Sequence, residues 1–276
     1  MIYEKILLSE KYPDADLTVY VSGNPYTNFA EPRAAVIVCP GGGYSFVSPR
    51  EAEPVVKKFF AEGYNVYLLN YSVGEKARDF APLIEAALAI KYVRENAASH
   101  KTDPNRIFII GFSAGGHLAA SSGILWNIKP VRDALGITEG KAPEGINKPD
   151  GMILSYPVIT GGQYRHKGSI ANICGKADPT DEERDVFSLE KHVDATSAPA
   201  FIWHTVTDKS VPIQNALLLI DAYVANSRPI EAHLYPTGVH GLSLCTAETA
   251  EKPEQLRPDV SSWFGLALDW IRNFTA

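Results

Sequence analysis

Bulky apolar runs alternate with helical patterns along most of the chain. Short runs of this kind are typical of strands buried on both faces of a parallel sheet. They cover residues 34–39, 64–70, 106–112, 151–156 and 200–204, with a shorter run at 230–235. Helices are predicted over residues 49–62, 82–96, 114–122, 212–226 and 260–274. Strands that alternate with helices predict a single α/β domain over residues 1–276, in which a mostly parallel sheet is covered on both faces.

Other segments depart from this alternation. Residues 17–21 alternate between apolar and polar side chains, which predicts an early edge strand. Residues 22–33 and 131–149 are rich in Gly and Pro, so we interpret them as a loop and a surface excursion. Residues 159–199 have no clean period and include a charged run. Because long irregular segments are often lids or pocket walls, we expect a small cap insertion there.

The most informative stretch follows the apolar run at 106–112. It reads Gly111-Phe112-Ser113-Ala114-Gly115, which has the G-x-S-x-G pattern of a nucleophile elbow. In this turn a serine sits between a strand and a helix in a strained conformation, and side chains at the flanking glycines would collide with neighbouring backbone. A buried strand before the motif and a small-residue helix after it are the context that the motif requires. We therefore predict that Ser113 is a catalytic nucleophile.

A serine nucleophile needs a base, usually a histidine held by an acid, and in this architecture the chain order is Ser, Asp or Glu, then His. His240 follows the last short strand, and the adjacent Gly238 and Gly241 would let its loop fold back over the elbow. We predict that His240 is the base. The remaining histidines are expected elsewhere: His233 in a strand, His100 in a surface turn, His204 and His117 beside or beneath the site, and His166 and His192 in the 159–199 segment, where His166 could line a pocket.

Asp208 is the predicted acid of the triad. It lies in the loop after the strand at 200–204 and stands between Ser113 and His240 in the sequence. The alternative is that it only caps the helix that follows, a frequent role of Asp at such a position. Asp194 and the acids of the charged run come too early in the chain for this role.

Acyl transfer also needs donors for the negative charge that develops on the carbonyl oxygen. One is the backbone N–H of Ala114, directly after the nucleophile. Gly41, Gly42 and Gly43 follow a buried strand, where glycines leave N–H groups accessible. We predict Gly42 and Gly43 as further oxyanion donors, and the alternative is a flexible turn. No His, Cys, Asp or Glu cluster has ligand spacing, so we expect neither a metal nor an organic cofactor.

Composition and charge indicate which kinds of molecule the protein can bind. The chain is 45% hydrophobic and 21% charged, with a formal net charge of −6, which argues against a nucleic acid or an anionic membrane as partner. No stretch approaches the ~20 apolar residues of a membrane span. The three cysteines are far apart, and the apolar patch at residues 1–10 is too short for a signal peptide. We expect a cytoplasmic protein with a small-molecule partner; a homodimer is compatible with the sequence.

Over residues 15–275 the chain resembles the α/β-hydrolase superfamily, and within it the small bacterial esterases that are similar to acetyl-xylan and feruloyl esterases. The resemblance lies in Cys39-Pro40-Gly41-Gly42-Gly43-Tyr44, in 111–119, in 204–212 and in 238–241. Relatives of the hormone-sensitive-lipase branch have a histidine before the three glycines and an aspartate before the nucleophile. Pro40 and Phe112 stand at these positions here, which favours the carbohydrate-esterase branch.

The resemblance implies a three-layer α/β-hydrolase sandwich that hydrolyses short-chain acyl esters. The expected substrate is an acetyl ester on a carbohydrate such as a xylo-oligosaccharide, cleaved through an acyl-enzyme. Two alternatives stay open: an aryl-formamidase-like amidase with the same triad, and a non-catalytic binding protein with the hydrolase fold. The complete set of Ser113, Asp208 and His240 argues against the second.

Overall fold

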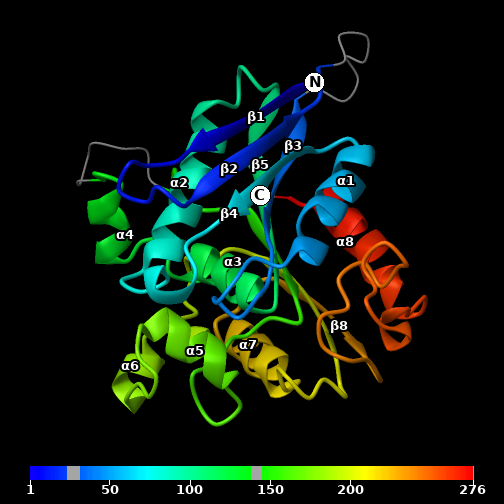
Figure 1. Cartoon of the computed structure of the whole chain (residues 1–276). Helices are drawn as coiled ribbons and strands as arrows, with labels where there is room; N and C mark the ends of the chain where they lie inside the picture. Colours follow the sequence, from blue (N-terminus) through cyan, green and yellow to red (C-terminus); the bar gives the residue numbers. More distant parts are fainter. Residues whose placement is uncertain (24–31, 138–144, 276) are drawn as a thin grey trace.

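The computed structural model describes residues 1–23, 32–137 and 145–275, which form an eight-stranded sheet with helices on both faces (Figure 1). Its strand order is β1-β2-β4-β3-β5-β6-β7-β8. The strands are β1 (Ile2–Leu7), β2 (Asp16–Val21), β3 (Arg33–Cys39), β4 (Asn65–Asn70), β5 (Thr102–Phe112), β6 (Gly151–Ser155), β7 (Ala200–Thr205) and β8 (Ile230–Tyr235). β2 runs antiparallel to β1 and β4, and all other neighbouring strands are parallel. The predicted mostly parallel sheet is confirmed.

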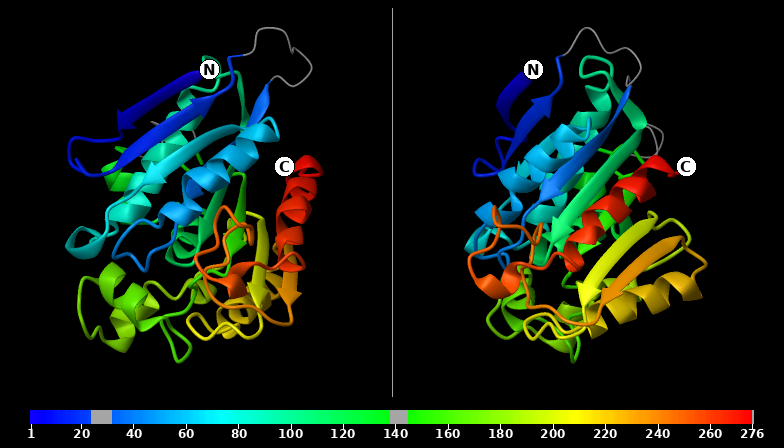
Figure 2. Two further views of the ribbon diagram at one scale, coloured as in Figure 1. Left: turned by 45° about the vertical axis from the view of Figure 1, so that its right-hand side comes forward. Right: turned by 90° about the vertical axis from the view of Figure 1, so that its right-hand side faces the viewer.

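Helices cover the two faces of the sheet and make a three-layer sandwich (Figure 2). They are α1 (Glu53–Ala61), α2 (Ala81–Glu95), α3 (Ala114–Ile124), α4 (Lys129–Ala134), α5 (Lys167–Cys174), α6 (Asp181–Asp185), α7 (Gln214–Ala225) and α8 (Trp263–Arg272). Short 3-10 turns are η2 (Pro49–Glu51), η3 (Gly74–Lys76), η4 (Leu189–Lys191), η5 (Pro253–Gln255) and η6 (Val260–Ser262). Side chains of α1 and α8 pack in one core, and those of α2, α3 and α7 pack in the other.

The central strands are apolar on both sides because each face is covered. In β3, Ile37 and Cys39 pack in the core beneath α2 and α3, whereas Val36 and Val38 pack in the core beneath α1 and α8. All four side chains are fully buried. This two-residue alternation of faces explains why the sequence shows a continuous apolar run instead of an alternating one.

The prediction of an edge strand at residues 17–21 was wrong. β2 is the second strand of the sheet and lies between β1 and β4. β1 forms the edge, and the sequence analysis missed it. Every residue of β1 except Ile6 is exposed, so no buried face imposes a hydrophobic pattern on it.

Two segments without an apolar period contain helices. α4 begins within two residues of the predicted surface excursion 131–149, and its Val131 is fully buried against the core. Residues 138–144 of that excursion and 24–31 of the predicted loop lie outside the described residues. The segment 159–199 holds α5, α6 and η4, and Figure 1 shows α5 and α6 together beyond the end of α3. Its role as a cap stays a prediction.

Two further features concern the chain as a whole. Of the helices in the described ranges, none combines the length and the apolar character needed to cross a membrane. Cys39, Cys174 and Cys245 are all free thiols, and burial raises the pKa of each of them.

Candidate active site

Ser113 lies between β5 and α3 in a backbone conformation that L-residues rarely adopt, with φ of 54°. The glycines on either side make this turn possible. A Cβ on Gly111 would lie 1.9 Å from the carbonyl oxygen of Gly115, and one on Gly115 would lie 2.1 Å from that of Cys39. The N–H of Ser113 donates to the carbonyl of Ser155 on β6, and this bond anchors the turn to the sheet. The turn thus has the strain and the crowding expected of a nucleophile elbow.

His240 lies beside this serine. Its Nε2 is 2.8 Å from Ser113 Oγ, and its Nδ1 is 2.6 Å from Asp208 Oδ2. The loop after β8 returns toward the elbow through two glycines. Gly241 has φ of 72°, and a Cβ on Gly238 would lie 2.6 Å from Thr205 Cγ2. The structure therefore brings together Ser113, His240 and Asp208, in the chain order that the sequence analysis used.

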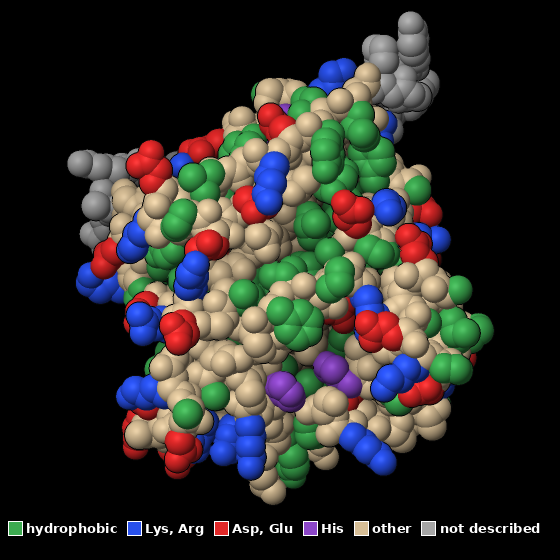
Figure 3. All heavy atoms as spheres, in the orientation of Figure 1, with side chains coloured by type: hydrophobic (Ala, Val, Ile, Leu, Met, Phe, Trp, Pro, Cys, Tyr) green, Lys and Arg blue, Asp and Glu red, His purple; other side chains and the backbone are tan. Residues whose placement is uncertain are grey.

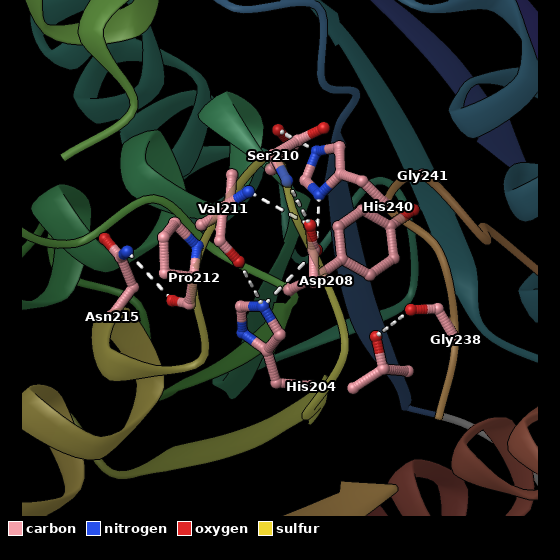
Figure 4. Close-up of polar contacts among 12 residues, drawn as sticks. His204, Asp208, Ser210, Val211, Pro212, Asn215, Gly238, His240 and Gly241 are labelled. Atoms are coloured by element: carbon pink, nitrogen blue, oxygen red, sulfur yellow. Dashed lines mark hydrogen bonds and ion pairs between the residues drawn. The ribbon is translucent and has the colours of Figure 1, made fainter. Parts of the chain in front are cut away.

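Asp208 is buried and surrounded by donors. Its Oδ1 accepts hydrogen bonds from the N–H groups of Ser210 and Val211, at 2.9 and 3.0 Å. Figure 4 shows His240 and His204 on opposite sides of the carboxylate, with His204 Nε2 3.4 Å from Oδ2. Burial alone would raise the pKa of Asp208, but hydrogen bonds from His204 and His240 hold it well below its ordinary value. Asp208 is therefore an anion at neutral pH. It caps the turn that follows through Oδ1 and contacts His240 through Oδ2, so one carboxylate has both roles.

In the described ranges, His240 is the histidine whose side chain is hydrogen-bonded to Ser113, whereas His117 meets it through the backbone, its N–H donating to the Ser113 carbonyl at 3.0 Å. His117 is buried beneath the elbow as expected, with Nε2 3.0 Å from the Phe187 carbonyl and Nδ1 2.8 Å from the Tyr44 hydroxyl. Burial lowers the pKa of His117 to about 4, so this ring stays neutral. His100 lies in a turn, as expected, but the expectation that this residue is at the surface was wrong. It is 5% exposed, and its Nδ1 is 2.9 Å from the Tyr67 hydroxyl.

The glycine loop after β3 lies against the elbow. A Cβ on Gly41 would come within 2.8 Å of the carbonyl oxygen of Phe112 and 3.2 Å of Ser113 Cβ. The Gly41 N–H donates to Glu51 Oε2, at 2.8 Å. The N–H groups of Gly42 and Gly43 have no acceptor among the described residues, and both glycines have positive φ, 125° and 65°. The loop therefore presents two backbone N–H groups without acceptors close to the serine. A turn that was merely flexible would not need this arrangement.

Glu51 links this loop to the histidine loop, and sequence reasoning missed it. Its Oε1 accepts a hydrogen bond of 2.6 Å from the Tyr156 hydroxyl, which in turn accepts one of 2.8 Å from the Ser243 N–H. The Tyr156 ring also contacts the His240 ring edge-on, with centroids 5.1 Å apart. In the sequence, Glu51 is one acid at the start of a predicted helix, and nothing local marks it as buried.

The segment 159–199 reaches the same place through α5. The Asn172 side chain donates to the Gly43 carbonyl, at 2.8 Å, and His166 stands at the N-cap of the helix. His240 and Asp208 both influence the pKa of His166, so its ring lies within their electrostatic range. Figure 3 shows a hollow in the lower half of this face, with two histidine side chains at its edge and hydrophobic side chains above it.

In the α/β-hydrolases a serine on a strand-to-helix turn is hydrogen-bonded to a histidine from a late loop of the sheet, and that histidine is hydrogen-bonded to an acid from another late loop. The chain has this fold, as solved relatives also indicate. It belongs to the BD-FAE family, an α/β-hydrolase esterase family, whose model matches residues 25–223. The match includes Ser113 and Asp208 but ends before His240, so the evidence for His240 is the geometry above.

Two curated proteins and one crystal structure illustrate which proteins the chain is similar to. Endo-1,4-beta-xylanase B of Butyrivibrio fibrisolvens is 35% identical over 78% of this chain and 33% of its own length. An acetylxylan esterase of Xylanibacter ruminicola is 27% identical over 83% of this chain and 45% of its own. The chain thus spans less than half the length of these curated relatives. A crystal structure of an acetyl ester-xyloside bifunctional hydrolase from Caldicellulosiruptor lactoaceticus is similar at a TM-score of 0.80 and 31% identity, covering 94% of this chain and 87% of that one.

Proposed function

We propose that the protein hydrolyses short-chain acyl esters, acetyl esters above all, on carbohydrates such as xylo-oligosaccharides. The observation that carries this proposal is the hydrogen-bonded series of Ser113, His240 and Asp208 at a strained elbow. A histidine bonded to a buried anion through Nδ1 carries its proton there, which leaves Nε2 free to accept the proton of the serine.

In the proposed reaction, Ser113 Oγ attacks the ester carbonyl while its proton passes to His240 Nε2. The imidazolium formed is stabilised by Asp208 and gives that proton to the leaving alcohol, and an acyl-enzyme remains. Water then attacks the acyl-enzyme with His240 as base, which releases the acid and restores the serine. In these steps Ser113 forms the covalent bond to the acyl group, and His240 carries each proton.

The N–H groups of Ala114, Gly42 and Gly43 are the proposed donors to the oxyanion. Ala114 begins α3, so its N–H has no acceptor within the helix, and the N–H of Gly41 is already bonded to Glu51. Each oxyanion donor lowers the barrier by about 3 kcal/mol. The segment 159–199 would form one wall of the site, since α5 is bonded to the carbonyl of Gly43.

The carbohydrate part of the proposal is supported by the relatives, which are named acetylxylan esterase, xylanase and acetyl ester-xyloside hydrolase. Ester cleavage is favoured over glycoside cleavage because glycosidases need two carboxyl groups that flank the scissile bond. Here the oxygens of Asp208 and Glu51 are all hydrogen-bonded within the protein.

The test is labelling with a fluorophosphonate, which reacts only with an activated serine, together with turnover of three substrate classes. These are acetylated xylo-oligosaccharides, p-nitrophenyl acyl esters of increasing chain length, and N-formylkynurenine. We expect labelling and acetyl ester turnover that both disappear in Ser113→Ala, which removes one hydroxyl and leaves the fold intact. Preferred turnover of N-formylkynurenine would support the amidase instead, and an unlabelled wild-type protein would support a non-catalytic binding role.

A further inference from the structure

His166 occupies a helix cap for which histidine is not a preferred residue. Ser, Thr, Asn and Asp are the common N-caps, because a short oxygen-bearing side chain reaches the free N–H groups of the first turn. At α5 the His166 Nδ1 takes that role and accepts a hydrogen bond of 3.2 Å from the Ser169 N–H. The Ser169 hydroxyl lies 2.8 Å from the same nitrogen. A smaller polar residue would cap this helix as well, so the cap alone does not explain the imidazole.

The cap determines which nitrogen of the ring carries the proton. A backbone N–H can only donate, so Nδ1 is the acceptor and the neutral ring has its proton on Nε2. The pKa of His166 is lowered, first by burial and then by His240, with Asp208 acting in the opposite direction, and this keeps the ring neutral. Nε2 makes no hydrogen bond to any residue in the described ranges, so its N–H is a free donor.

This donor lies close both to the glycine loop and to the catalytic histidine. The ring carbon Cε1, which is bonded to Nε2, lies 4.0 Å from the point that a Cβ on Gly43 would occupy. The ring is therefore next to a proposed oxyanion residue and within electrostatic range of His240. The leaving oxygen of the ester must approach His240 Nε2, because that atom supplies its proton. The carbonyl oxygen of an acetyl group already has the N–H groups of Ala114, Gly42 and Gly43 as its proposed donors. A further donor would therefore serve an oxygen of the alcohol part.

We infer that His166 is a specificity-determining residue, whose Nε2–H donates a hydrogen bond to a second oxygen on the alcohol side of the ester. The site would then prefer acyl groups carried by polyols, such as sugars, over the same groups on simple alcohols. This inference rests on the proposed esterase function.

The test uses two pairs of esters that differ in one atom of the alcohol. In 2-hydroxyethyl acetate and propyl acetate, a hydroxyl replaces a methyl group; in 2-methoxyethyl acetate and butyl acetate, an ether oxygen replaces a methylene. In His166→Asn the side-chain oxygen can still cap α5, but the variant lacks the Nε2–H group, which extends further from the backbone than the Asn amide. We expect this variant to lower the oxygen-to-carbon ratio of kcat/KM about threefold to tenfold in both pairs, the contribution of one hydrogen bond open to water. The value for propyl acetate should stay within about twofold of wild type, because that ester makes no such bond.

The matched control is His192→Asn, a histidine of the same segment whose Nε2 lies 2.8 Å from the Asp185 carbonyl. It should leave both ratios unchanged. An unchanged ratio in His166→Asn would overturn the inference, and so would an equal loss on all four esters, because that pattern indicates a structural role. A lower ratio for the hydroxyl pair alone would also overturn it, since a donor in the protein requires only an acceptor in the substrate. Failure of the esterase function itself is distinguishable, because the wild-type protein would then cleave none of these esters, whether or not it labels with fluorophosphonate.

Discussion

Replacement of Asp208 by asparagine should move the proton of the His240 ring from Nδ1 to Nε2. The Asn oxygen must take the place of Oδ1, because the N–H groups of Ser210 and Val211 can only donate to it. The amide NH₂ then faces His240 Nδ1 in place of Oδ2, which is 2.6 Å from that nitrogen in the wild type. A donor at this position requires Nδ1 to be unprotonated, so the proton moves to Nε2.

Asp208→Asn should lose activity because of the contact between the His240 ring and Ser113. Nε2 lies 2.8 Å from Ser113 Oγ, and once it is protonated it cannot accept the serine proton. Removing the acid of such a triad while the geometry is kept costs about 10⁴ in kcat. This corresponds to roughly 5 kcal/mol of transition-state stabilisation. The fold should be unaffected, since both bonds from the turn are retained.

The assay is steady-state hydrolysis of an acetyl ester, with circular dichroism to verify the fold. Asp194→Asn is the matched control, since Asp194 Oδ1 also accepts a local backbone hydrogen bond, from Thr196, but no histidine contacts it. We expect the control to stay within about twofold of wild type, as for a surface substitution. The reasoning is refuted if Asp208→Asn keeps more than about a tenth of the wild-type kcat, because a ring in the wrong tautomer cannot support that rate.

Three further predictions concern other parts of the molecule. Glu51→Gln leaves one of two buried donors, the Gly41 N–H or the Tyr156 hydroxyl, without an acceptor, so urea unfolding should register a loss of about 1–3 kcal/mol, whereas the exposed Glu53→Gln should change little. Burial raises the pKa of Glu85 to about 7. The folded state then keeps a proton that the unfolded chain loses above about pH 4.5, so this group contributes about 3 kcal/mol below that pH, and the contribution disappears as the pH rises to 7. Glu85→Gln should remove this part of the pH dependence of unfolding. Treatment with a chelator should leave ester turnover unchanged, and activity restored by added zinc would mean that a metal carries the chemistry.

The central sheet and the elbow could be predicted because their signals are local. The runs that became β3 to β7 are largely apolar on both faces, since each face is covered by helices. At Ser113 the constraint is equally local, because Gly111 and Gly115 are crowded by backbone atoms within a few residues or on the adjacent strand. A strained turn of this kind leaves a fixed pattern in the sequence.

Features that depend on distant partners left no such pattern. β1 has an exposed surface and is stabilised by pairing with β2, so its residues need not be apolar. Glu51 is buried because Gly41 and Tyr156 donate to it, and Tyr156 lies 105 residues away. The unusual cap at His166 becomes visible only when the ring is found beside Gly43. The strand β1 and the residues Glu51 and His166 all depend on partners that are distant in the sequence, so the residues around them carry no pattern that predicts their role.

His240 shows how far local signals extend. Its loop follows β8, the edge strand, which is three strands from β5, or about 14 Å at the usual spacing. The chain order and the flanking glycines predict that the loop returns to Ser113, and Gly241 does take the positive φ that such a return needs. They do not predict what fixes the loop there. The Arg50 guanidinium donates to the Gly241 carbonyl, at 2.9 Å, and the Arg50 carbonyl accepts from the Ser243 hydroxyl. Arg50 directly precedes Glu51, which is bonded to the glycine loop. One turn of the chain thus contacts the loops on both sides of Ser113, and substitutions there should affect the position of the base and of the oxyanion donors together.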